Sequence, residues 1–198
     1  MNINFITPLY RYDNIPTIYE NINSITSNFN WYLIEGSNKI GDTDVSHILK
    51  DSRVVYHKIN TQQIWGHEQR NFFIKNIECV SDDWCYFLDD DNLITQDIID
   101  VINDKDNSNA DIILMSQKMG NTDQTRLYGL LGHLSLGNCD IGSFLIKYKI
   151  IKNTYIYNED QRNADGHYCE QLNSINNINI KYLLNKFTKY NALSDKIL

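Results

Sequence analysis

Three adjacent carboxylates, Asp89, Asp90 and Asp91, have the clearest potential for chemistry in this 198-residue sequence. They directly follow residues 84–88, an apolar run whose length and composition predict a buried strand. Carboxylates this close repel one another unless a cation compensates their charge. Hard oxygen ligands suit Mg²⁺ or Mn²⁺, which proteins hold with one or two carboxylates plus substrate phosphates. The triplet is therefore a candidate divalent-metal site.

The spacing within the triplet leaves alternatives open. In an extended segment Asp89 and Asp91 point to the same side, so that one can hold a metal while another carboxylate meets a ligand hydroxyl. The same residues could instead form a solvated acidic turn that caps the next helix. An EF-hand calcium loop fits poorly, because its sixth position falls on Ile94, where the motif requires glycine.

Two helical segments carry further candidate groups. Residues 66–77 begin at a glycine and predict a helix on which Arg70 could reach a diphosphate or a nucleobase, or could be an ordinary surface arginine. Asp165 begins the helical segment 165–175, where it could act as a general base or simply cap the helix. His167 is another candidate base or late metal ligand, although a packed or exposed histidine is the simpler interpretation.

The amino-terminal segment adds a third group. Residues 3–7 predict a short buried strand ended by a proline, and candidate ligand-binding residues lie at its end and in the loop after it: Thr7, Pro8, Tyr10 and Arg11. In an open α/β sheet that loop lines the ligand pocket. Glu35 ends the next apolar strand, residues 31–34, at the same edge. The alternative for the loop is an amphipathic surface segment.

Alternating strands and helices must position these groups. Apolar spacing predicts helices at 15–25, 45–49 and 95–103, and strands at 53–57, 111–115, 141–146 and 181–190. This alternation favours an α/β fold with a mainly parallel central sheet flanked by helices. Ligands bind outside the carboxyl ends of the strands in such sheets, which is where the acidic triplet falls.

Composition and charge narrow the class of protein. A net charge of -7 and a pI of about 5.1 disfavour nucleic-acid binding. The four cysteines form no CxxC pair or zinc-like cluster, so we expect reduced thiols and a cytoplasmic protein. The first residues lack the pattern of a signal peptide, and no stretch reaches the ~20 apolar residues of a transmembrane helix. We therefore expect no transmembrane segment.

Taken in order, these segments resemble the GT-A-fold glycosyltransferases, in particular the family-2-like group that includes small viral and bacterial members. The resemblance is carried by Phe5-Ile6-Thr7-Pro8-Leu9-Tyr10-Arg11, Trp31-Tyr32-Leu33-Ile34-Glu35, Gly66 with Arg70-Asn71, and Trp84-Cys85-Tyr86-Phe87-Leu88-Asp89-Asp90-Asp91-Asn92. It covers roughly residues 3–175. It implies one GT-A (Rossmann-like) domain over 1–198, with a nucleotide-binding half at about 1–92 and an acceptor-binding half at about 93–198.

The resemblance also implies a role for each candidate residue. Residues 7–11 and Glu35 would hold the nucleobase and ribose, and Arg70 would lie near the base or diphosphate. Asp89 and Asp90 would face the ribose or donor sugar, while Asp91 would bind Mn²⁺ or Mg²⁺ together with the diphosphate and waters. Residues 139–142 match a segment beside the donor and acceptor sugars. Asp165 falls where inverting members place their catalytic base.

The function so implied is metal-dependent, inverting transfer of a sugar from a nucleotide-diphosphate sugar, here a UDP-sugar, to a glycan or other hydroxyl acceptor. The metal would neutralise the departing diphosphate, and a carboxylate would take the acceptor proton. Two alternatives are a non-catalytic nucleotide- or glycan-binding domain and a sugar nucleotidyltransferase. The second usually needs a glycine-rich basic loop after the first strand, and residues 8–12 contain no glycine.

Overall fold

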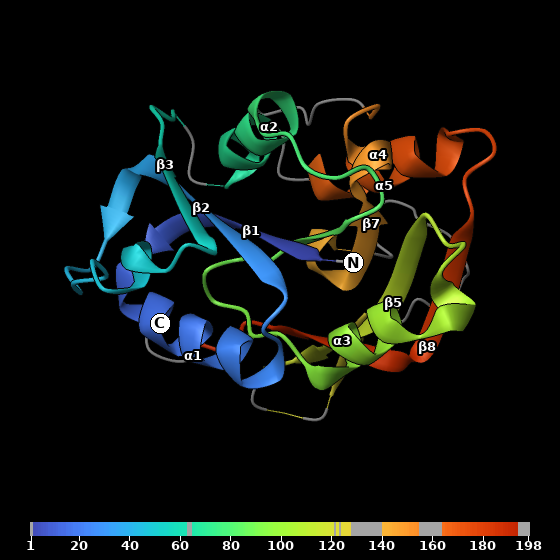
Figure 1. Ribbon diagram of the computed structural model, residues 1–198, viewed down its shortest axis with the longest axis horizontal. Coiled ribbons are helices and arrows are strands. Elements are labelled where there is room, and N and C mark those ends of the chain that lie inside the picture. The colour runs from blue at the N-terminus through green and yellow to red at the C-terminus, as the bar shows by residue number, and fades with distance from the viewer. Residues whose placement is uncertain are drawn as a thin grey trace.

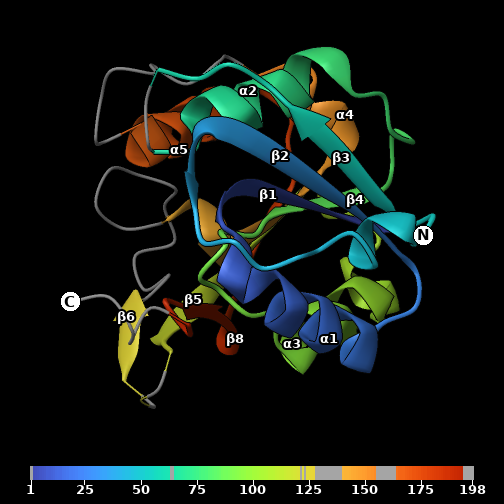
Figure 2. The ribbon, with the colours of Figure 1, turned by 90° about the vertical axis from the view of Figure 1, so that its left-hand side faces the viewer.

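A computed structural model describes residues 2–62, 65–120, 122, 124–127, 140–154 and 164–193. Helices cover both faces of one mixed sheet, which gives three layers (Figures 1 and 2). The strands are β1 (Ile3–Arg11), β2 (Phe29–Ile40), β3 (Val54–Lys58), β4 (Trp84–Phe87), β5 (Ile112–Met119), β6 (Thr125–Leu127), β7 (Phe144–Lys147) and β8 (Ile180–Tyr190). The helices are α1 (Ile15–Ile25), α2 (His67–Asn76), α3 (Gln96–Asn103), α4 (Tyr148–Ile151) and α5 (Ala164–Ser174).

The strand order is β3-β2-β1-β4-β7-β5-β6, and β8 pairs with β5. The pairs β1–β2, β2–β3, β1–β4 and β5–β8 are parallel. β7 lies antiparallel between β4 and β5, and β6 is antiparallel to β5. The sheet is therefore mostly parallel, as the sequence predicted, and the carboxyl ends of β1, β2, β3 and β4 lie at one edge.

Two hydrophobic cores fill the spaces between the layers, because successive strand side chains point to opposite faces. Phe5 of β1 packs into one core with Ile18 of α1. Ile6, its neighbour in the strand, packs into the other core with Phe73 of α2 and Leu172 of α5. Figure 1 shows α1 and α3 on one side of the sheet and α2, α4 and α5 on the other.

Several predicted boundaries are wrong, for identifiable reasons. β1 does not end at Pro8 but continues to Arg11. The pairing of β1 with β4 stops at Ile6, so Pro8 is paired with β2 alone. A proline is tolerated there because its missing N–H faces no second strand. β2 likewise runs past Glu35 to Ile40. The helix expected at 45–49 is a 3₁₀ turn at Ile48–Lys50.

The expected strand at 141–146 begins later than predicted. Ile141–Ser143 form a 3₁₀ turn, and β7 starts only at Phe144. Asp140 caps this turn by accepting a hydrogen bond from the backbone N of Gly142 at 2.9 Å. An aspartate followed by a glycine two residues later is a local capping signal that the apolar spacing concealed.

Three of the four cysteines lie among the described residues. Cys79, Cys85 and Cys169 form no disulfide with one another, while Cys139 lies outside the described residues. Within the described ranges, no helix combines the length and the hydrophobicity that crossing a bilayer requires.

Candidate active site

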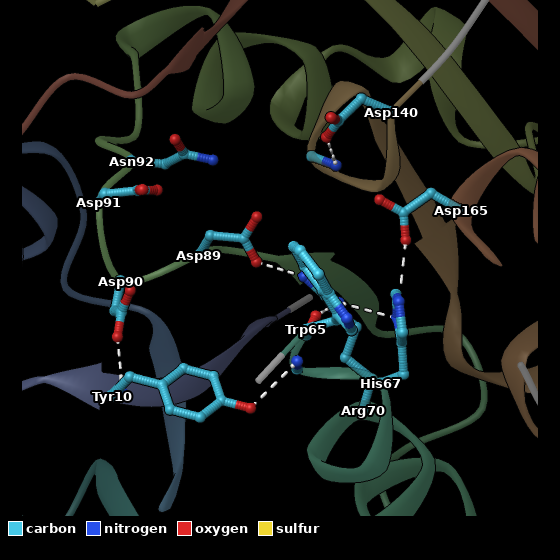
Figure 3. A network of polar contacts seen from close by, with 12 residues as sticks. Tyr10, Trp65, His67, Arg70, Asp89, Asp90, Asp91, Asn92, Asp140 and Asp165 are labelled. Carbon is cyan, nitrogen blue, oxygen red and sulfur yellow. Dashed lines mark hydrogen bonds and ion pairs between the residues drawn. The ribbon is translucent and has the colours of Figure 1, made fainter. Parts of the chain in front are cut away.

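The three carboxylates of the acidic triplet diverge instead of alternating along an extended segment. The chain leaves the sheet after β4 and turns at Asp90 and Asp91, so the expectation of an extended triplet is wrong. Asp89 contacts Arg70 of α2, and Asp90 reaches back to Tyr10 of β1 (Figure 3). Asp91 lies beside Arg11. One sequence motif therefore supplies three groups with different surroundings.

Asp90 fastens the end of β1 to the turn after β4. Its side chain is 2% exposed, and its Oδ2 accepts hydrogen bonds from the backbone N of Tyr10 at 2.6 Å and of Arg11 at 2.7 Å. Its Oδ1 pairs with Nη1 of Arg11 at 2.5 Å. Charge-assisted hydrogen bonds of this kind are stronger than neutral ones. The Asp90 carboxylate is thus committed to holding two segments together.

Arg70 is the buried cation of the site. Its guanidinium is 4% exposed, pairs through Nη2 with Oδ1 of Asp89, and donates through Nη1 to the carbonyl of Trp65 at 3.0 Å. Helix α2 can begin here because Gly66 adopts a left-handed φ of 79°, and a Cβ at Gly66 would lie 2.8 Å from Pro8. Burial raises the pKa of Asp89 despite the neighbouring Arg70.

Asp91 is the least compensated member of the triplet. Burial raises its pKa to about 6, the charge of Asp89 adds to this effect, and Arg11 at 3.2 Å opposes it. A carboxylate whose charge is only partly balanced favours a cation. The described residues contain no cluster of three or more His, Cys, Asp or Glu that could hold a metal. The donor set therefore fits an ion bound by Asp91 and otherwise by substrate phosphates and water.

A pocket opens at the carboxyl edge of β1 and β4. It is lined by Pro8, Tyr10, Trp65, Gly66, Arg70, Asp89, Asp90, Asp91, Tyr190 and Asn191. The hydroxyl of Tyr10 accepts a hydrogen bond from the backbone N of Gly66 at 3.1 Å, which joins β1 to the start of α2. Six of the residues that the sequence predicted to bind the donor or the metal therefore line one pocket: Pro8, Tyr10, Arg70, Asp89, Asp90 and Asp91.

Three lining residues were missed by the sequence analysis. Trp65 directly precedes the glycine that opens α2, which is a weak local signal. Tyr190 and Asn191 follow from no local pattern, because they reach the site only when the end of β8 docks against the acidic turn. There the backbone N of Leu193 donates to the carbonyl of Asp91 at 3.0 Å.

Three predicted nucleotide-binding residues do not line the pocket. Arg11 contacts Asp90 and Asp91, and the other two lie elsewhere. Thr7 is fully buried, and its hydroxyl accepts a hydrogen bond from the indole N of Trp31 at 2.9 Å. Glu35 is surrounded by the Tyr12 and Tyr56 hydroxyls and by Nζ of Lys58 at 2.6 Å. Burial alone would raise the pKa of Glu35, but these hydrogen bonds outweigh it and lower the pKa. Neither residue lines the pocket.

Asp165 faces the site from the first turn of α5, across from Asp91 (Figure 3). Its Oδ1 is buried and has no hydrogen-bond partner among the described residues; Nδ1 of His67 lies 4.0 Å away. Burial raises the pKa of Asp165 to about 7, with the charges of Asp140 and Asp89 adding and Arg70 opposing. This carboxyl can therefore exchange a proton near neutral pH.

The two histidines near Asp165 differ in their surroundings. Burial and the charge of Arg70 lower the pKa of His67 to about 4, so its ring is neutral at neutral pH. The side chain of His167 is 42% exposed and lies 3.4 Å from Glu170 on the same helix. His67 therefore does not compete with Asp165 as the group that exchanges a proton near neutral pH.

Comparison with known proteins gives structural matches only. No protein-family profile matches the chain. No curated protein matches it by sequence. Among solved structures, S. aureus TarS 1-349 in complex with UDP matches with a TM-score of 0.68 and 15% identity, over 96% of this chain and 60% of that one.

Two further structures extend the likeness. The mannosyltransferase PcManGT from Pyrobaculum calidifontis, in complex with GDP-Man and Mn²⁺, matches with a TM-score of 0.64 and 8% identity, over 98% of this chain and 58% of that one. The glycosyltransferase GlyE of Streptococcus pneumoniae TIGR4 gives a TM-score of 0.50 and 16% identity, over 92% and 45%. The chain thus spans 60% or less of each of these proteins. The sheet order, the helices on both faces and this likeness together show that the chain has the GT-A-type fold of glycosyltransferases.

Proposed function

We propose that this protein is a metal-dependent, inverting glycosyltransferase that moves a sugar from a UDP-sugar to a hydroxyl group of a glycan or other acceptor. One observation carries the proposal. Arg70 and Asp91 line a pocket at the carboxyl edge of the sheet, and Asp165 faces the same site from the other side (Figure 3). The similar structures that hold UDP, or GDP-Man with Mn²⁺, support a nucleotide-sugar donor. The choice of UDP follows the sequence resemblance.

The residues divide the chemistry between donor and acceptor. Arg70 offers a cation to the diphosphate, and Asp91 would hold Mn²⁺ or Mg²⁺ beside it. When bound, that ion supplies positive charge to the departing diphosphate. Tyr10 and Trp65 provide aromatic surface in the same pocket. In this proposal the donor-binding half is about residues 1–92 and the acceptor-binding half about 93–198, while Tyr190 and Asn191 add a wall to the donor side.

Asp165 serves the acceptor in this mechanism. The acceptor hydroxyl oxygen attacks the anomeric carbon, the bond from that carbon to the diphosphate oxygen breaks, and the hydroxyl proton passes to Asp165. A base and a leaving group on opposite sides of the sugar give inversion. The raised pKa of Asp165 suits this step, because a base works best with a pKa near the operating pH.

A thermal-shift screen tests the donor site. UDP, GDP, TDP and CMP would each be added with and without Mn²⁺ or Mg²⁺ to wild type, to Asp91→Ala and to Asp42→Ala, which changes an exposed carboxylate away from the site. At a ligand concentration of about one hundred times Kd, binding stabilises the folded protein by about 2.7 kcal/mol. For a chain of this length, that raises Tm by roughly 5–10 °C. We expect a metal-dependent shift with UDP that Asp91→Ala loses and Asp42→Ala keeps.

The outcomes separate the competing functions. The absence of any shift with every nucleotide would refute the glycosyltransferase proposal. Binding of UDP with Mn²⁺, but neither transfer nor donor hydrolysis, would favour a non-catalytic binding domain. A product with retained anomeric configuration, determined by NMR, would remove Asp165 from the role of base. The nucleotidyltransferase alternative gains no support, because β1 continues through residues 8–11 and leaves no glycine-rich loop there.

A further inference from the structure

Asn92, which directly follows the acidic triplet, is completely buried. Its Oδ1 accepts a hydrogen bond from the backbone N of Asn191 at 2.6 Å. This contact fixes the amide orientation, because a flipped amide would turn its NH₂ group toward another donor. Nδ2 therefore points the other way, into the space between Asp91 and Asp140 (Figure 3).

The Nδ2 group of Asn92 has no hydrogen-bond partner within the described part of the chain. Native structures satisfy roughly 90% or more of such buried groups, because an unsatisfied one destabilises the folded state. The donor is also held rigidly by the Asn191 contact on the opposite side of the amide. Asn92 adjoins Asp91 and contacts Asn191, two residues that line the pocket. A fixed, unsatisfied donor in this position indicates that a ligand supplies the acceptor.

Gly142 borders the space that this donor faces. A Cβ built on Gly142 would lie 3.3 Å from Oδ1 of Asp140, 3.5 Å from Nδ2 of Asn92 and 3.6 Å from Nε2 of Gln117. Three polar atoms from separate segments thus converge on one side of this glycine. Gly142 is not among the glycines with a positive φ. Its small size is therefore what matters here, and not its backbone freedom.

The polar groups around this space select a particular ligand chemistry. Asn92 offers an N–H donor, while Asp140 and Asp89 offer carboxylates, each of which can accept several hydrogen bonds. An anionic ligand group would be repelled by the two carboxylates. A hydroxyl group satisfies both partners at once, because it accepts from the amide and donates to a carboxylate.

We propose that Asn92 and Asp140 bind a hydroxyl group of the transferred sugar, which makes Asn92 a specificity-determining residue of the donor site. The inference rests on the proposed function, since it needs a nucleotide sugar in the pocket. It differs from the general donor site in one measurable respect. Asn92 should contribute to binding of the sugar and not to binding of the nucleotide diphosphate.

Calorimetric titration of the whole chain tests this separation. Wild type, Asn92→Ala and Gly142→Ala would be titrated with UDP and with UDP-glucose, UDP-galactose and UDP-N-acetylglucosamine in the presence of Mn²⁺. Gly142→Ala fills the space without touching the Asn191 contact. The matched control is Asn76→Ala, an exposed asparagine on α2. Melting temperatures of all variants report any loss of structure.

We expect both site variants to bind the preferred UDP-sugar roughly 3- to 10-fold more weakly, the value of one hydrogen bond, while UDP affinity stays within about twofold of wild type. Asn92→Ala should also melt at a lower temperature, because it loses the Asn191 contact. Equal changes in UDP and UDP-sugar affinity, or no change in either, would overturn the proposal while the glycosyltransferase function stands. A wild type that binds no nucleotide would overturn both.

Discussion

Replacing Asp165 by asparagine should make the metal-free protein more stable at alkaline pH while it strongly reduces the rate of transfer. The pKa of Asp165 is raised from 3.8 to about 7, so folding favours its protonated form. The stability that this carboxyl contributes is complete below its unfolded-state pKa and is lost as the pH rises through about 7. Asparagine has no such ionisation, so the variant should gain on wild type across this range.

The size of the effect follows from the two pKa values. Each pH unit between them is worth about 1.4 kcal/mol, so wild type should lose roughly 2 kcal/mol relative to Asp165→Asn between pH 5.5 and about 7. The Asp165 side chain is 29% exposed, and solvent screening reduces this figure to about 1 kcal/mol. For a chain of this length, that difference widens the gap in Tm by roughly 2–4 °C.

Scanning calorimetry at pH 5.5 and pH 8, without metal or nucleotide, would measure this gap for wild type, Asp165→Asn and the control Asp42→Asn. Transfer by Asp165→Asn at pH 8 should fall by about 10²–10⁴, the typical contribution of a general base. Wild-type activity should rise with pH up to about 7, as the base ionises. A gap that stays constant between the two pH values, or that favours wild type at pH 8, would refute the assignment of a buried, proton-exchanging Asp165.

Three further substitutions test the supports of the site, each by denaturant unfolding at pH 8. Arg70→Met should cost about 3 kcal/mol, because it leaves Asp89 without its buried cationic partner, and an unchanged stability would contradict that role of Arg70. Asp90→Asn should cost about 2 kcal/mol, since an amide nitrogen would face the N–H donors of Tyr10 and Arg11. An unchanged stability would show that these hydrogen bonds of Asp90 are dispensable. Gly66→Ala should cost about 1–3 kcal/mol through its positive φ and its close contact with β1, and wild-type stability in this variant would contradict the strain argument.

Much of the architecture could be predicted because its signals are local. The isoleucines of α1 recur at helical spacing and are buried at Ile15, Ile18 and Ile22 as expected. The acidic triplet was predicted at the end of a buried strand. It lies there because it follows that strand directly in the sequence. The predicted ends of strands were wrong where pairing with a neighbouring strand determines them. β1 extends through Pro8 because β2 still pairs with it there, although its pairing with β4 has ended at Ile6.

The groups of the site, and the edge of the sheet that they reach, could be predicted from the sequence, since strand direction and hydrophobic pattern follow from residues close in the chain. The role of each group depends on contacts between distant segments. The tertiary structure turned Asp90 toward a strand about 80 residues earlier and enclosed Glu35 among Tyr12, Tyr56 and Lys58. It also brought Asn191 to Asn92. These contacts depend on how distant segments pack, and the hydrogen bonds and desolvation that define each side chain's role exist only after that packing has formed.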